Sequence, residues 1–80
     1  MTYGTVAEVA AEIGRLPESV TGAETAQWTR WLERVERDIE ARFVRAGLSL
    51  SEQVSLMMPD AGTVADIEVA AVARKVENPT

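Results

Sequence analysis

The residues whose spacing comes closest to a chemical site are Glu33, Glu36 and Glu40, which recur every three or four positions. That spacing places them along one side of a helix, and carboxylate oxygens are the ligands that Ca²⁺ and Mg²⁺ prefer. A calcium ion takes about six or more oxygens, and no neighbouring loop supplies the others. Solvated surface carboxylates are therefore the favoured interpretation, and we expect no metal site.

Catalysis of other kinds lacks its usual residues. The chain has no histidine and no cysteine, which removes the commonest general base, the thiol nucleophile and the main zinc ligands. It also has no glycine-rich loop of the kind that holds phosphates. We predict a protein that is not an enzyme, with no catalytic residue, no cofactor-binding residue and no bound cofactor.

Arginines follow the same stretch of chain, in a row made of Arg30, Arg34, Arg37 and Arg45. Acidic residues lie between them at the spacing of ion pairs on a helix, which would join Glu33 with Arg37, Arg34 with Asp38 and Asp38 with Arg42. The favoured interpretation is a solvated helix face; the alternative is a row that meets an acidic partner or a phosphate. Nucleic-acid binding is disfavoured, because the formal net charge is −5 and such binding depends mainly on basic residues.

Eighty residues make one small domain, which we place over residues 1–80. A chain of this size buries only about 60% of the surface that its unfolded form exposes, and it has no disulfide to help, so oligomerisation remains open as a source of stability. No apolar run approaches the ~18 residues of a membrane span, and no signal-peptide pattern opens the chain. We expect a soluble protein, made in the cytoplasm, that contacts no membrane and is not exported by a cleaved leader.

A long helix predicted over residues 22–46 must position most of these side chains. Thr21 and Glu24 form a capping box at its start, and Gly47 suits the left-handed residue that follows a helix end. Its apolar residues recur at steps of three and four and form one buried stripe, made of Trp28, Trp31, Leu32, Val35, Ile39, Phe43 and Ala46. The helix is long enough to run the full width of the molecule, so the other elements must pack on it.

Three further helices are predicted, over residues 5–16, 50–58 and 63–77. Each begins at a capping pair, namely Thr5 with Glu8, Ser49 with Glu52 and Thr63 with Asp66. Residues 49–58 also alternate in part, as a strand would, and the helix is the favoured interpretation. The predicted fold class is all-α: a small bundle of three main helices plus a short one, organised on a long central helix.

The last helix is apolar on two sides. One side carries Val64, Ile67 and Ala71, and the other carries Ala65, Val69, Val72 and Val76, with Glu68 and Lys75 in a polar seam between them. Either this helix is central and wrapped by the others, or one side meets a neighbouring subunit. Trp31, at the edge of the long helix's stripe beside Arg42, is either a core residue or an interface anchor. The candidate interface residues are Trp31, Arg42, Ile67, Val69, Val72, Val76, Leu56 and Met58.

The order and spacing of these features resemble a family of small head–tail connector proteins of tailed bacteriophages, also called adaptor or head-completion proteins. The likeness covers the opening TYGTVAEVAAEIGR with its Gly14-Arg15 ending, the long helix with WLERVERDIEARF, and the closing VARKVENP that leads from Arg74 or Lys75 to Asn78-Pro79. Its motifs are helix caps and apolar positions, spread over nearly the whole chain.

The resemblance implies a structural protein of the virion that acts at the interface between head and tail. Its copies would form a ring, dodecameric by resemblance, below the portal protein. The ring would extend the DNA channel, let DNA pass through its lumen without specific binding, and dock the next connector or stopper protein on the tail side. The alternative is a small acidic regulatory or toxin-neutralising module that binds one protein partner.

Overall fold

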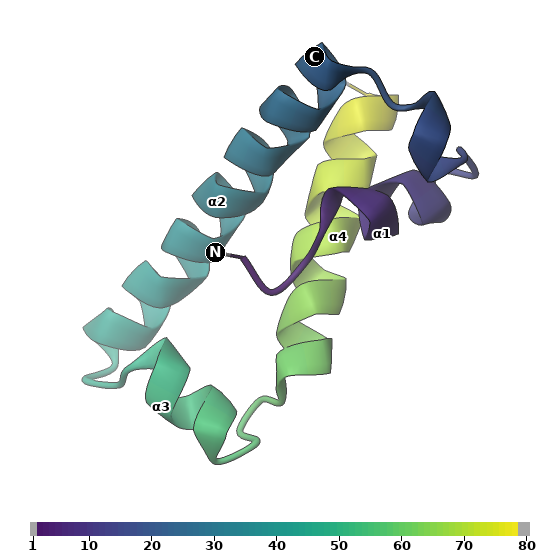
Figure 1. Cartoon of the computed structure of the whole chain (residues 1–80). Helices are drawn as coiled ribbons and strands as arrows, with labels where there is room; N and C mark the ends of the chain where they lie inside the picture. The colour runs from purple at the N-terminus through teal and green to yellow at the C-terminus, as the bar shows by residue number, and fades with distance from the viewer. Residues whose placement is uncertain (1, 79–80) are drawn as a thin grey trace.

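The structure, a computed structural model, describes residues 2–78, and every regular element in that range is helical (Figure 1). In chain order these are α1 (Val6–Glu12), the 3₁₀ helix η1 (Pro17–Ser19), α2 (Gly22–Arg45), α3 (Leu50–Ser55) and α4 (Ala61–Glu77). The predicted all-α fold class is confirmed, and the ambiguous stretch 49–58 forms a helix. Pro79, the last residue of the predicted closing motif, lies outside the described residues.

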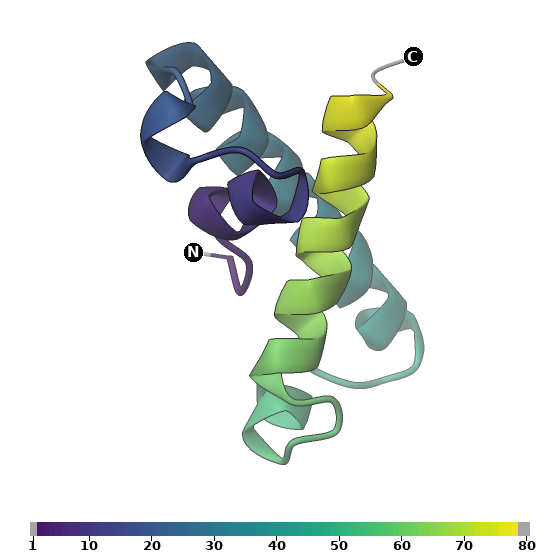
Figure 2. The same cartoon turned by 90° about the vertical axis from the view of Figure 1, so that its right-hand side faces the viewer.

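Helix α2 runs almost the whole length of the molecule. Its 24 residues correspond to roughly 36 Å, and the longest dimension of the molecule is 40 Å. Helix α4 lies alongside it, and α1 crosses both of them close to the N-terminal half of α2 (Figures 1 and 2). Helix α3 lies at one end of the molecule, away from the end of α4 that carries the C-terminus.

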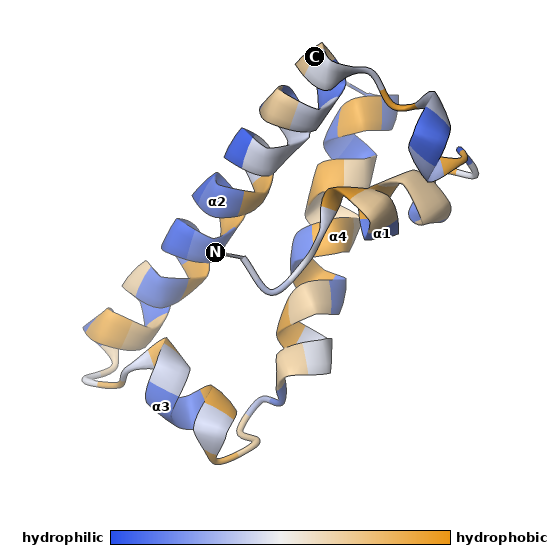
Figure 3. Ribbon diagram, viewed as in Figure 1, coloured by the Kyte–Doolittle hydropathy of each residue, from blue (hydrophilic) through white to orange (hydrophobic). Residues whose placement is uncertain are grey.

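The core forms where α1, α2 and α4 meet. Its buried side chains are Val9, Ala10, Trp28, Leu32, Val69, Val72 and Ala73. On α2 the predicted stripe is fully buried only at Trp28 and Leu32, whereas Ile39 and Phe43 are half-buried and Ala46 is exposed. Helix α4, which packs against both α1 and α2, supplies more of the buried residues than α2 does. In Figure 3 the polar colour of α2 lies on its outer side, and the apolar colour lies along the edge that is turned toward α4.

Two of the predicted capping boxes are confirmed. The backbone N–H of Glu8 donates to the Thr5 hydroxyl, and the backbone N–H of Thr5 donates to the Glu8 carboxylate. Thr21 and Glu24 make the same reciprocal pair at the start of α2. Each box satisfies backbone donors that the first helical turn leaves without partners.

The other two predicted capping pairs do not form, although α3 begins at Leu50 as predicted. Helix α4 begins one turn early, because the Asp60 carboxylate accepts the backbone N–H of Thr63 at 2.7 Å and therefore caps the helix itself. Ser49 precedes α3 as predicted, but its hydroxyl makes no capping bond and lies 3.1 Å from the Ser51 hydroxyl. With only six residues and no capping bond, α3 depends on its tertiary contacts with α2.

Helices α1, α2 and α3 end in the same way, each followed by a residue in the left-handed conformation. These residues are Gly14 at φ 78°, Gly47 at φ 77° and Met57 at φ 57°. In each case the next backbone N–H reaches back to the third residue from the helix end, as in the bond from Leu48 to the Phe43 carbonyl at 2.8 Å. This turn ends α1 at Glu12 instead of residue 16, and α3 at Ser55 instead of residue 58.

Candidate protein-binding surface

Large apolar side chains are exposed mainly at the end of the molecule that holds α3. Seven such side chains are exposed among residues 2–78, and five of them lie between residues 44 and 58. These five, which we call the apolar end, are Val44, Leu48, Leu56, Met57 and Met58, with exposed fractions from 45% to 79%. Exposed apolar side chains gathered in one region are typical of a surface that binds another protein or a membrane.

Met57 is the most exposed of these side chains, at 79%, and its backbone is strained. Its φ of 57° places it in the left-handed region, which costs an L-residue with a Cβ roughly 1–2 kcal/mol and costs glycine almost nothing. The equivalent positions after α1 and α2 are occupied by Gly14 and Gly47. Met57 thus combines a strained backbone with an apolar side chain that contributes little to the core.

The two predicted sides of α4 are divided differently in the structure. Val72, at 1% exposed, and Val69, at 7%, are buried in the core, so these two are wrong as interface residues. Val76 is half-buried and packs against the core. Val64 also faces inward, because α1 and α2 together cover a wider arc of α4 than one helix could. Ile67 is half exposed at 51% and, with Ala71, forms the outward side.

Trp31 and Arg42 are separated in the structure. Trp31 packs against the core, and the Lys75 ammonium of α4 lies 5.0 Å from the centre of its ring. Arg42 occupies a similar angular position on α2 but lies eleven residues further on, which corresponds to roughly 16 Å along the helix. Trp31 therefore helps to join α2 to α4, and Arg42 is an exposed surface residue.

Two interface predictions coincide with the apolar end. Leu56 and Met58 are 63% and 67% exposed, so both are available to a partner. Sequence reasoning did not include Met57, Val44 or Leu48 in that surface. The run Leu56-Met57-Met58 before Pro59 was the available signal, since consecutive apolar residues beyond a helix end have no single face to bury.

A hollow of about 260 Å³ adjoins the apolar end on the side of α2 that carries Glu36 and Glu40. Tyr3 from the N-terminal segment and Leu48, Ser49, Leu50 and Ser51 from the start of α3 complete its lining, together with Val44. Within this hollow the carboxylate of Glu36 accepts the backbone N–H of Tyr3 at 3.1 Å. The hollow therefore joins acidic groups to apolar walls.

Glu68, which the sequence places in a polar seam between the two apolar sides of α4, is completely buried. Its Oε1 accepts the backbone N–H of Gly4 at 2.7 Å, while its Oε2 has no hydrogen-bond partner. Burial, with the adjacent Glu36 carboxyl as the second cause, raises the pKa of Glu68 to about 7. A proton on Oε2 can then be donated to Glu36, which would supply the missing partner.

Gly4 allows this bond because the N-terminal segment lies directly on α4. A Cβ at position 4 would come within 3.0 Å of Val69 and 3.3 Å of the Ala65 carbonyl oxygen. The two backbone bonds, from Tyr3 to Glu36 and from Gly4 to Glu68, tie the N-terminal segment to α2 and α4 respectively.

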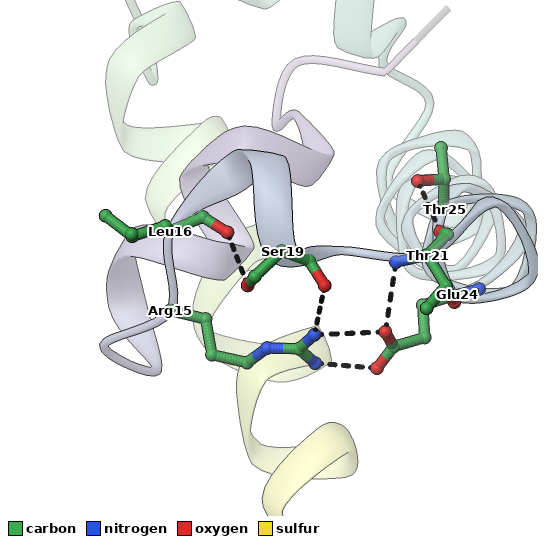
Figure 4. A network of polar contacts seen from close by, with 6 residues as sticks. All are labelled: Arg15, Leu16, Ser19, Thr21, Glu24 and Thr25. Atoms are coloured by element: carbon green, nitrogen blue, oxygen red, sulfur yellow. Dashed lines mark hydrogen bonds and ion pairs between the residues drawn. The ribbon is translucent and has the colours of Figure 1, made fainter.

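Arg15 joins α1, η1 and α2, as Figure 4 shows. Its guanidinium donates to both carboxylate oxygens of Glu24, at 2.6 and 3.1 Å, and to the Ser19 carbonyl at 2.9 Å. It also lies 5.6 Å from the centre of the Trp28 ring. The hydrogen bonds from Arg15, with a backbone bond from Thr21 as the second cause, lower the pKa of Glu24 to about 2. Arg15 is therefore a structural residue of the junction between helices.

The predicted ion pairs along α2 do not form. Among residues 2–78 the one salt bridge is that between Arg15 and Glu24, so Glu33, Asp38 and their predicted arginine partners are exposed without ion pairs. In the same range there is no group of three or more acidic, histidine or cysteine side chains arranged to hold a metal ion. No helix of the described range is long and apolar enough to cross a membrane.

Comparison of the chain with protein-family models, curated proteins and solved structures gives no match.

Proposed function

We propose that this protein is a structural assembly subunit that acts by binding other proteins, and specifically a head–tail connector of a tailed bacteriophage. The observation that carries the protein-binding role is the apolar end, which leaves five large apolar side chains exposed in a domain of 80 residues. The specific role as a connector comes from the resemblance of the helix caps and apolar positions to that family.

A protein partner fits the apolar end better than a membrane does. Helices that lie on membranes carry lysine and arginine beside their apolar residues, which attract anionic lipids. Between residues 44 and 60 this chain has a single basic residue, Arg45, against the acidic Glu52 and Asp60. In the proposed ring, the apolar end would dock the portal or the next tail-side protein.

The strained backbone of Met57 supports the same proposal. Glycine at this position would relieve the left-handed conformation, as Gly14 and Gly47 do elsewhere in the chain. A large, 79% exposed methionine at such a position is instead useful to a partner, because methionine adapts its shape to irregular apolar surfaces. Strain of this kind tends to be kept where function depends on it.

The test is genetic complementation in the phage that encodes the protein. Deleting the gene should give heads that fail to join tails, and the wild-type gene supplied from a plasmid should restore tailed particles. Leu56→Ser should fail to restore them, whereas Leu16→Ser, at a leucine of similar exposure (65% against 63%) outside the apolar end, should succeed.

Two results would count against the proposal. Normal tailed particles after deletion would refute the connector role and favour the regulatory or toxin-neutralising module. Equal complementation by Leu56→Ser and Leu16→Ser would show that the apolar end is not the docking surface.

A further inference from the structure

Charged residues on α2 are separated into two sides of opposite sign. Counted from the buried Trp28 at about 100° per residue, Glu33, Glu36 and Glu40 fall at about 80–140°. All five arginines of the helix fall at about 180–320°, an arc that holds two acidic residues, Asp38 and Glu24; the arginines are Arg30, Arg34, Arg37, Arg42 and Arg45. We call these two surfaces the acidic side and the arginine side.

Neither side is neutralised within the molecule. The described residues contain one salt bridge, between Arg15 and Glu24, and it pairs none of the five α2 arginines and none of the three glutamates of the acidic side. The arginines are exposed, as are Glu33 and Glu40. Glu36 is half-buried, and its carboxylate accepts the backbone N–H of Tyr3, a bond that does not cancel its charge.

We propose that the acidic side of one copy binds the arginine side of α2 in a second copy, so that successive copies join side by side. The proposal rests on the proposed function, because it supplies the contact between neighbours in the ring. The second copy is the chosen partner because the two sides cover the same part of the helix, with glutamates over 33–40 and arginines over 30–45. Two parallel α2 helices would therefore bring the opposite charges together in register.

This contact joins different surfaces of the two copies, which is the kind of contact that builds rings. An isologous contact between two acidic sides, or between two arginine sides, would instead bring like charges together.

The hollow beside Glu36 and Glu40 offers a place where an arginine side chain of the second copy can bind. Its walls include Val44, Leu48 and Leu50, which can cover the aliphatic part of an arginine side chain. The carboxylate of Glu40 at its edge can then accept bonds from the guanidinium, and two-point pairing of this kind is the strongest that a surface arginine makes.

Charge reversal on each side, followed by mixing, tests the contact directly. The first variant combines Glu33→Arg with Glu40→Arg, and the second combines Arg34→Glu with Arg42→Glu. All four residues are exposed, so both variants should keep the wild-type circular dichroism spectrum. Self-association is measured by sedimentation velocity over a concentration series, at low and at high salt.

The wild-type protein should associate at low salt and dissociate as salt is added, because exposed charge pairs are screened. In each variant alone, one side has lost or reversed the charge that attracts the other side, so its association should weaken by about tenfold or more. An equimolar mixture should associate more strongly than either variant alone, because the unchanged acidic side of the second variant can then bind the unchanged arginine side of the first. Rescue by mixing would not follow from damage to the fold.

The proposal is overturned if the wild-type protein stays monomeric at every concentration in low salt, or if the mixture associates no better than the separate variants. These failures are distinct from failure of the proposed function. If Leu56→Ser still prevents tailed particles while α2 shows no charge-dependent association, the connector role stands and the contact between copies lies elsewhere.

Discussion

Replacing the buried Glu68 by glutamine should remove a pH dependence of stability that the wild-type protein has near neutrality. Glu68 is fully buried, with one carboxylate oxygen bonded to Gly4 and the other without a partner. Its pKa rises from 4.5 to about 7 on folding, chiefly through burial. The folded state therefore holds this proton more tightly than the unfolded state does.

The direction and size of the change in the free energy of unfolding with pH follow from that difference in proton binding. The free energy of unfolding should be highest near pH 4.5 and should fall as the pH rises towards 7, where Glu68 becomes a buried charge beside Glu36. At about 1.4 kcal/mol per pH unit, the interval from 4.5 to about 7 corresponds to at most about 3–4 kcal/mol. That is a large part of the ~5 kcal/mol expected for a small domain. The lowered pKa values of Glu24 and Asp60 act in the opposite direction, and only as the pH falls below 4.5.

The assay is urea unfolding followed by tryptophan fluorescence and circular dichroism at pH steps between 4.5 and 8. Glu68→Gln keeps an oxygen for the Gly4 N–H and stays neutral, so it should match the wild type near pH 5 and exceed it above pH 7. Glu40→Gln, at an exposed residue of α2, is the control and should keep the wild-type slope. A wild-type stability that is flat or rises between pH 5 and 7 would refute the reasoning.

Three further predictions concern stability. Val72→Glu should unfold the protein, because it places a charge where the side chain is 1% exposed. Ile67→Glu, at a side chain that is 51% exposed, should keep a free energy of unfolding within about 0.5 kcal/mol of the wild type. Similar unfolding of the two variants would mean that the faces of α4 are misassigned. Gly4→Ala should lower the free energy of unfolding, measured with urea, by about 1–3 kcal/mol, because the new Cβ would lie 3.0 Å from Val69. Gly22→Ala is the control and should not lower it, because a Cβ there contacts nothing within 4 Å. Met57→Gly should raise the free energy of unfolding by about 0.5–1 kcal/mol, because relieving the strain of the left-handed backbone gains more free energy than the greater entropy of the unfolded chain loses. A loss of stability would show that the Met57 side chain supports the fold.

Local signals in the sequence predicted the helices well and their ends less well. Thr5 with Glu8 and Thr21 with Glu24 each form a complete capping box within four consecutive residues, so no knowledge of the rest of the fold was needed. Thr63 with Asp66 has the same pattern, yet Asp60 caps α4 instead. Either start is locally possible, and the turn from Met58 to Asp60 that decides between them depends on where α3 ends.

The spacing of apolar residues along α4 could not predict which of its side chains are buried. The sequence showed two apolar sides and a polar seam, but Glu68 in that seam became the most deeply buried acid of the described residues. Its burial follows from the N-terminal segment, where Gly4 is small enough to lie against α4 and bring a backbone N–H to the carboxylate. A contact between residues separated by 64 positions leaves no mark on a helical wheel.

At Met57, the proposed docking role and the stability of the fold would favour different residues. The backbone of Met57 is strained in a way that glycine would relieve, and its exposed side chain adds little to the packing of the core. Met57→Gly removes both the strain and the side chain, whereas Met57→Ala removes most of the side chain and keeps the strain. If the side chain serves the partner, both variants should lose docking to a similar degree although their stabilities differ. If docking instead followed stability, Met57→Gly would bind at least as well as the wild type, and the methionine would have no role in recognition.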